Sequence, residues 1–218
     1  MFKRGTIFLV VILLGCTSAQ IVSNWKNPDI VIFNASKVLI VGMARDEGVR
    51  KDFETRMKRE FTKRDVEAVR SIDLFDVAFT QSARTEAELN RVEQQLLDKD
   101  FDAILFTKVL GSENHQSFVN QVAELDKDTW RFRDDYLSNQ RIYYDQDNED
   151  SFKVYHAETS LYCICVDKER ELIWRGAIDI TEPNNISKAI DEYIDLVVTA
   201  LQDQDLIFRS QSNQSDSK

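Results

Sequence analysis

From residue 38 onward, strand-like and helix-like patterns of hydrophobic residues alternate along the chain. Residues 38–41 are continuously apolar, which is typical of a central strand covered on both faces. In the segment that follows, apolar residues recur every four positions and predict an amphipathic helix. These residues are Val49, Phe53, Met57 and Phe61. Residues 66–72 then resemble a second strand.

A capping box opens the next predicted helix, because Thr85 is followed three positions later by Glu88. The stretch "FDAILFTKVLG" at 101–111 predicts a third strand that ends at Gly111. Residues 154–166 and 171–181 alternate around a charged turn and predict a hairpin. A wide apolar stripe over 186–201 predicts the last helix.

The predicted order is therefore β-α-β-α-β-(insertion)-β-β-α, which indicates a single-domain α/β sandwich with a mixed sheet. We expect this domain at 36–208, with an acidic, aromatic insertion at 112–152 and a disordered tail at 209–218. Residues 16–35 are expected to form a tether and entry segment. The pattern leaves open whether the helices cover one or both faces of the sheet.

The first fifteen residues have the anatomy of a signal peptide: Lys3 and Arg4 precede an apolar run at 7–14. The run is too short for a membrane span, which needs about 20 apolar residues. Its end, Leu13-Leu14-Gly15-Cys16, resembles the lipobox of bacterial lipoproteins. This resemblance implies cleavage after Gly15, acylation of Cys16, and anchoring at the periplasmic face of the outer membrane, since no Asp follows Cys16.

The acidic net charge of the chain limits which macromolecules it can bind. The chain has 28 basic and 38 acidic residues, a formal net charge of −10. Nucleic acid is excluded as a partner, because phosphate contacts need clustered Lys and Arg. Anionic lipid head groups would repel the chain as a whole, so the acyl chains on Cys16 are expected to hold it at the membrane.

Cys163 and Cys165 lie two residues apart in a predicted strand, so both thiols face the same side. A disulfide between them would be strained. The pair could also be half of a metal site, but no other Cys and no nearby His completes the four ligands. We therefore expect buried free thiols.

Three motifs resemble the superfamily that contains the curli secretion lipoprotein, the penicillin-binding-protein activator lipoproteins and the amino-terminal domain of TolB. They are "KVLIVG", "DLF" and "FDAILFTKVLG", each at the expected place in the order of elements. The resemblance implies an α/β fold in the cell envelope and assigns no activity.

"DLF", "AILFTKV" and "YHAETSLYCIC" also resemble a family of bacterial outer-membrane lipoproteins, some of which carry the label cardiolipin synthetase. The phospholipase D-type enzymes use paired His-x-Lys motifs with a nucleophilic His. His115 is followed by Gln116 and Ser117, and His156 by Ala157 and Glu158, so neither matches. We expect no cardiolipin synthase activity.

Few residues suggest chemistry. Asp145, Asp147 and Glu149 have the first spacings of an EF-hand, but the loop lacks its Gly and its final Glu. His156 and Glu158 share one strand face and form the alternative hypothesis, a periplasmic enzyme or small-ligand-binding site. No glycine-rich phosphate loop occurs, so we expect neither cofactor nor metal.

The insertion interleaves aromatic and Arg residues, the types that anchor protein interfaces. The candidate partner-binding residues are Trp130, Arg133, Tyr136, Tyr143 and Tyr144. The alternative is that these rings only pack the insertion onto the domain. The favoured interpretation is a non-catalytic, lipid-anchored envelope protein that binds a periplasmic or outer-membrane partner.

Overall fold

The computed structural model describes residues 19–75, 79–111, 131–144, 154–164, 171–181 and 185–208. The strands are β1 (Ala19–Lys26), β2 (Lys37–Met43), β3 (Glu67–Arg70), β4 (Ala103–Gly111), β5 (Val154–Cys163) and β6 (Leu172–Thr181). The helices are α1 (Glu47–Thr62), α2 (Ser71–Leu74), α3 (Glu86–Leu97), α5 (Phe132–Asn139), the 3-10 helix η3 (Gln140–Tyr143) and α6 (Ile186–Asp203).

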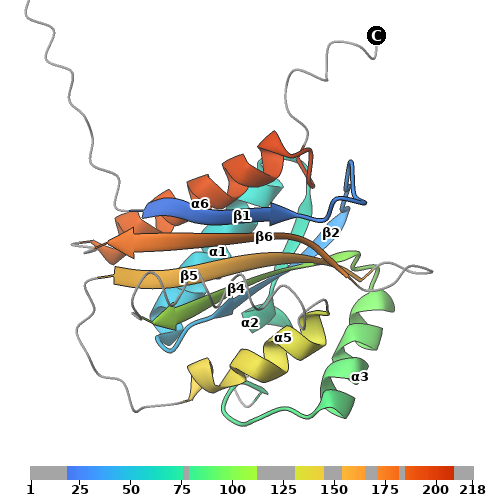
Figure 1. Ribbon diagram of the computed structural model, residues 1–218. Helices are drawn as coiled ribbons and strands as arrows, with labels where there is room; N and C mark the ends of the chain where they lie inside the picture. The colour runs from blue at the N-terminus through green and yellow to red at the C-terminus, as the bar shows by residue number, and fades with distance from the viewer. Residues whose placement is uncertain are drawn as a thin grey trace, which may run out of the picture.

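The strands form one mixed sheet in the order β1-β6-β5-β4-β2-β3 (Figure 1). Strand β2 runs parallel to β3 and β4, because each connection crosses over through helices. Strand β5 runs antiparallel to both β4 and β6, and β1 runs antiparallel to β6; β5 and β6 are the predicted hairpin. The predicted fold class, an α/β domain with a mixed sheet, is confirmed.

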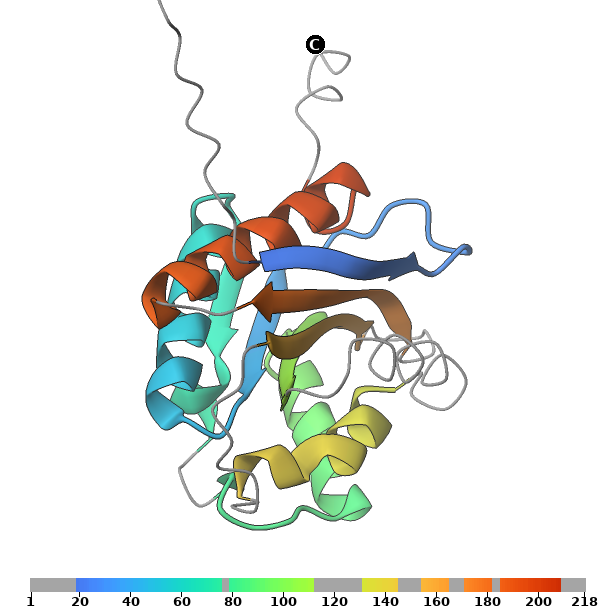
Figure 2. The ribbon, with the colours of Figure 1, turned by 60° about the vertical axis from the view of Figure 1, so that its left-hand side comes forward.

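Helices cover both faces of the sheet, so the domain has three layers (Figure 2). Alternation along β2 explains the division, since successive side chains on a strand point to opposite faces. Val38 and Ile40 belong to the core beneath α1 and α6. Leu39 and Val41 belong to the core on the opposite face, together with residues of α3 and α5.

The expected tether at 16–35 contains a strand that the hydrophobic pattern did not reveal. Residues 19–26 form β1, which pairs with β6 at one edge of the sheet. Of these residues only Ala19 is buried, and the others are exposed or intermediate. An edge strand with so little burial has no clear apolar alternation, and its pairing comes from backbone hydrogen bonds to β6.

The segment between β1 and β2 is held against the end of α6. The Nζ of Lys26 donates hydrogen bonds to the carbonyl oxygens of Val31 and Gln204, both at 2.8 Å. Phe33 forms an isolated parallel bridge with Leu206. These contacts close the end of the core under α6.

Candidate functional site

His156 and Glu158, the candidate catalytic pair, lie inside the domain on β5. Their exposed fractions are 1% and 0%. The Nδ1 of His156 lies 2.6 Å from Oδ1 of Asp179, which is directly opposite on β6. Glu158 contacts a different set of charges. The two residues share a strand face as predicted, but the fold places neither at the surface.

Glu158 belongs to a buried group that we call the core charge cluster: Lys108, Asp135, Glu158 and Arg175. The Nζ of Lys108 lies 2.6 Å from Oδ1 of Asp135 and 2.9 Å from Oε1 of Glu158. The Nε of Arg175 lies 3.3 Å from the same oxygen of Glu158. All four side chains are buried. Two cations thus face two anions in a region without access to water, where pairing offsets the cost of desolvation.

The two cations of the cluster hold their protons firmly. Burial lowers the pKa of the Lys108 ammonium, but the carboxylates of Asp135 and Glu158 outweigh it and raise this pKa above its ordinary value. For Arg175, burial likewise lowers the pKa of the guanidinium and Glu158 raises it, and the net result is a raised pKa. These cations are therefore fixed partners of the carboxylates rather than proton donors at neutral pH.

Asp135 connects the cluster to the insertion, because it is a residue of α5. Its Oδ2 accepts a hydrogen bond of 2.6 Å from the hydroxyl of Tyr162 on β5. Its Oδ1 accepts a further bond from Nδ2 of Asn139. Burial and the neighbouring carboxylate raise the pKa of Tyr162 well above its ordinary value, so this phenol stays a donor. The arrangement attaches α5 to the sheet.

A second buried polar group lies at the carboxyl end of β2. Oε1 of Glu54 accepts hydrogen bonds from the backbone of Gly42 at 2.9 Å, from Nε of Arg50 at 3.1 Å and from Oγ of Ser71 at 2.7 Å. Oε2 accepts from the backbone of Ile72. Because Ser71 and Ile72 bond to Glu54, they begin α2, and β3 ends before the predicted boundary at residue 72.

Sequence patterns gave little sign that these groups would be buried. Arg50 and Glu54 have the i,i+4 spacing of an ordinary surface ion pair on a helix. Lys108 lies in an otherwise apolar strand, and Asp135 lies in the insertion. A cation inside an apolar run was the available signal, since such a residue needs a buried partner.

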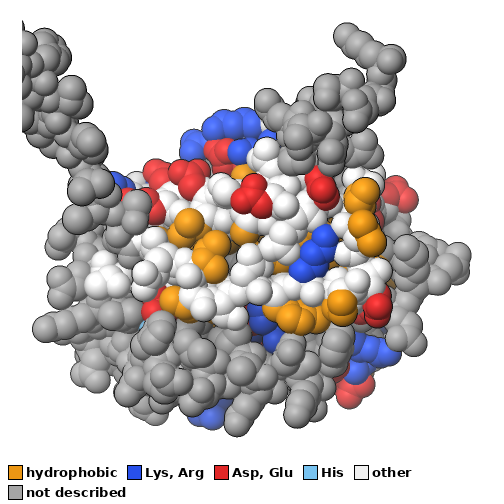
Figure 3. Space-filling model, turned by 45° about the horizontal axis from the view of Figure 1, so that its top comes forward, with side chains coloured by type: hydrophobic (Ala, Val, Ile, Leu, Met, Phe, Trp, Pro, Cys, Tyr) orange, Lys and Arg blue, Asp and Glu red, His pale blue; other side chains and the backbone are white. Residues whose placement is uncertain are grey.

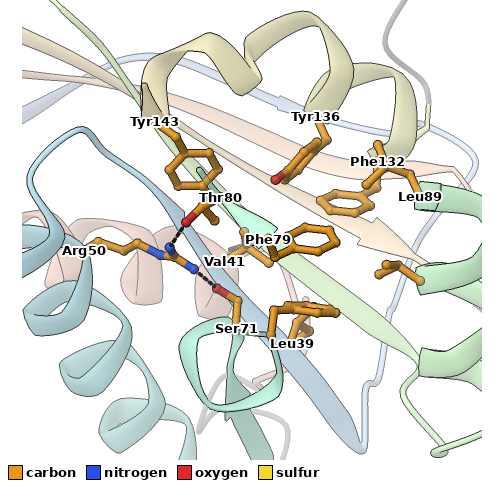
Figure 4. A pocket seen from close by; sticks show the side chains of 12 residues that line it. Leu39, Val41, Arg50, Ser71, Phe79, Thr80, Leu89, Phe132, Tyr136 and Tyr143 are labelled. Carbon is orange, nitrogen blue, oxygen red and sulfur yellow. Dashed lines mark hydrogen bonds between the residues drawn. The ribbon is translucent and has the colours of Figure 1, made fainter. Parts of the chain in front are cut away.

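A small cavity lies between β2 and the aromatic side chains of the insertion (Figure 4). Its volume is about 10 Å³, room for about one water molecule. Arg50 closes one end and donates to Ser71 and Thr80 (Figure 4). The remaining lining residues are apolar or aromatic: Leu39, Val41, Phe75, Phe79, Leu89, Val92, Phe132, Tyr136 and Tyr143. The cavity is far smaller than the pockets that bind organic ligands.

The candidate partner-binding residues divide between core and surface. Tyr136 is 3% exposed and packs on Phe106 and Phe132. The hydroxyl of Tyr143 donates to the backbone oxygen of Gly42 at 3.0 Å. Both rings therefore attach the insertion to the domain.

The other candidates lie further out. Tyr144 is 37% exposed. The side chain of Arg133 is partly exposed and pairs with Glu86 at 3.0 Å. Trp130 lies outside the described residues. Of the candidates that the structure describes, Arg133 and Tyr144 are therefore the two that remain accessible.

Cys163 corrects an expectation. It is disulfide-bonded rather than a free thiol. Cys165, the second cysteine of that expectation, lies outside the described residues.

The candidate EF-hand residues Asp145, Asp147 and Glu149 lie outside the described residues. Within the residues that the structure describes, no group of three or more His, Cys, Asp or Glu side chains is arranged to hold a metal ion. In the same part of the chain, no helix combines the length and the apolar character needed to cross a membrane.

No protein-family model and no curated protein matches the chain. Among solved structures, a PelC dodecamer from Paraburkholderia phytofirmans is similar with a TM-score of 0.45 and 8% identity, over 84% of this chain and 97% of that chain. Lipoprotein GNA1162 from Neisseria meningitidis gives a TM-score of 0.39 and 12% identity, over 76% and 96%. Similarity at this level does not identify a function.

Proposed function

We propose that this chain is a non-catalytic lipoprotein of the bacterial outer membrane, which holds its α/β domain at the periplasmic face and binds an envelope partner there. The observation that carries the proposal is the position of the lipobox-like Leu13-Leu14-Gly15-Cys16. The first strand begins at Ala19, so two residues separate Cys16 from the folded domain. An anchor at Cys16 would attach the sheet directly to the bilayer.

The bonded state of Cys163 supports an exported location. Disulfides persist in oxidising compartments such as the periplasm and are rare in the cytosol. A disulfide at Cys163 therefore agrees with passage across the inner membrane, which the residues at 1–15 predict.

The buried polar groups favour a non-catalytic role. Glu158 accepts from two cations, and His156 pairs with Asp179. A general acid or base must reach its substrate, and these side chains are enclosed in the domain. No observation among the described residues favours the alternative of an enzyme at His156 and Glu158.

Lipidation is tested by labelling cells that express the full chain with radioactive palmitate. We expect label in the protein and its loss in Cys16→Ala, with release of that variant from the membrane fraction. Ser18→Ala is the matched control and keeps both label and location. Label or membrane attachment that persists in Cys16→Ala contradicts the anchor.

Partner binding is tested by crosslinking the native lipoprotein in cells and identifying the attached proteins by mass spectrometry. Trp130→Ala and Tyr144→Ala are expected to reduce a specific crosslinked species severalfold. Gln95→Ala, at an exposed position on α3, is the control. A crosslinking pattern that none of these variants changes argues against the insertion as the binding surface.

A further inference from the structure

We infer that β1 and the loop after it, residues 27–35, rest on the bilayer, with Val31 and Ile32 inserted among the lipid head groups and upper acyl chains. We call this surface the β1 side. The inference rests on the proposed anchor at Cys16 and adds an orientation and a second membrane contact.

The length of the tether limits how far the domain can stand from the membrane. Thr17 and Ser18 are the only residues between Cys16 and Ala19. Three Cα-to-Cα steps span at most about 11 Å when fully extended. An acylated cysteine lies at the level of the lipid head groups. The start of β1 therefore stays within about two strand spacings of these head groups.

The β1 side exposes apolar side chains next to this anchor. Val31 is 78% exposed and Ile32 57%, and Ile21 on the strand itself is 36% exposed. The loop is ordered by hydrogen bonds from Lys26 to the carbonyl oxygens of Val31 and Gln204. Two adjacent β-branched residues are thus presented to the outside on a fixed backbone. Figure 3 shows scattered hydrophobic side chains on this side of the molecule, together with acidic and basic ones.

Charge along the β1 side differs from that of the rest of the chain. Between residues 19 and 35 the sequence contains one cation, Lys26, and one carboxylate, Asp29. The whole chain has a net charge of −10. Acidic surfaces are repelled by anionic head groups. The segment itself has no net charge, so it presents no excess of carboxylates to anionic head groups.

The two membrane contacts lie at opposite ends of one strand. From Ala19 to Lys26, β1 extends about 23 Å at roughly 3.3 Å per residue. An acyl anchor at one end and an apolar loop at the other place the strand along the bilayer. One lipid signal combined with a second contact gives firmer attachment than either alone. Helices α3 and α5 then lie on the side of the domain that faces away from the membrane (Figures 1 and 2).

The orientation is tested with full-length, acylated protein in phosphatidylethanolamine and phosphatidylglycerol vesicles. An environment-sensitive fluorophore is attached at Val31→Cys, and at Gln95→Cys on α3 as the matched control. Unsubstituted protein, labelled in parallel, measures any signal from native thiols. The vesicles contain lipids with a nitroxide near the top of the acyl chain, which quenches fluorophores at that depth.

We expect nitroxide lipids to reduce the fluorescence at position 31 at least twofold and to leave position 95 unchanged. Equal quenching at both positions, or none at position 31 in protein that is bound to vesicles, overturns the inference. A signal at position 31 that depends on protein concentration and not on nitroxide also overturns it, because a second copy then covers the loop.

A separate measurement distinguishes failure of the proposed orientation from failure of the proposed lipid anchor. Mass spectrometry before reconstitution shows whether Cys16 carries acyl chains. An unmodified Cys16 defeats the proposed function. Acylated, vesicle-bound protein without quenching at position 31 defeats only the orientation.

Discussion

The Nζ of Lys108 lies 2.6 Å from Oδ1 of Asp135, and both side chains are fully buried. This ion pair joins the central strand β4 to α5, the helix within the insertion. The insertion is therefore part of the folded domain at this point and not a separate appendage. Its attachment depends on a charge pair that has no access to solvent.

Replacing Asp135 with Ala leaves the Lys108 ammonium with one carboxylate fewer in the core. Loss of one partner from a buried ion pair costs about 3–5 kcal/mol, and we expect this decrease in the free energy of unfolding by urea titration. Asp134→Ala on the same helix is the control. Its carboxylate is partly exposed and pairs at the surface, so its effect stays below about 1 kcal/mol. Equal losses in the two variants contradict a special role for the buried pair.

The double variant Lys108→Met with Asp135→Leu removes both charges together. It is expected to be more stable than Asp135→Ala, since no uncompensated charge remains in the core. The measurement is the same urea titration. A double variant less stable than the single one indicates that the pairing of Lys108 with Glu158 contributes more stability than the excess charge costs.

Alkaline pH is expected to destabilise the domain through Tyr136. Burial raises the pKa of Tyr136 to about 12 from an ordinary value of 10.0. Between these values the unfolded chain loses the phenolic proton and the folded state keeps it, so the free energy of unfolding falls as pH rises. The contribution is about 1.4 kcal/mol per pH unit.

Tyr136→Phe removes this contribution and makes the decline between pH 10 and about 12 less steep, as measured by unfolding at a series of pH values. The decline does not vanish, because burial also raises the pKa of Tyr162. Tyr144→Phe, at an exposed position, serves as the matched variant. A decline of the same slope in Tyr136→Phe and in the unsubstituted protein shows that other groups control the alkaline loss.

The capping box at the start of α3 gives a local prediction. The side chain of Thr85 accepts from the backbone of Glu88, and the side chain of Glu88 accepts from the backbone of Thr85. Thr85→Ala removes this cap and is expected to lower the free energy of unfolding by about 1 kcal/mol. Thr85→Ser keeps a hydroxyl acceptor and remains within a few tenths of the unsubstituted protein. Similar losses in both variants indicate packing of the methyl group instead.

The disulfide at Cys163 predicts that this cysteine reacts with an alkylating reagent only after reduction. Under denaturing conditions, iodoacetamide is expected to modify Cys163 only after treatment with a reductant, and peptide mass mapping identifies the modified residue. Modification of Cys163 without reductant contradicts the disulfide. Denaturation is necessary because burial alone would also protect a thiol.

Much of the fold was predictable because its signals are local. The stripe at Val49, Phe53, Met57 and Phe61 predicts α1, and these residues lie within its observed bounds. The β5–β6 hairpin follows from period-two alternation on each side of a charged turn. Strand β1 escaped prediction, since an edge strand with a single buried residue leaves no periodic trace.

The candidate site was less predictable than the fold. Period two correctly placed His156 and Glu158 on one face, but their partners Asp179 and Arg175 are set by the register between β5 and β6. Aromatic content alone could not distinguish Tyr136, which packs in the core, from Tyr144, which is exposed.

By itself, the sequence determined the α/β class and the main helices and strands from residue 38 onward, because these depend on neighbours along the chain, and its composition determined the net charge. The tertiary structure decided which polar residues are buried and what they pair with. Lys108 and Asp135 are 27 residues apart and Lys108 and Glu158 lie on different strands. Their burial is favourable only after β4, β5 and α5 bring opposite charges together, because a lone charge would remain in water.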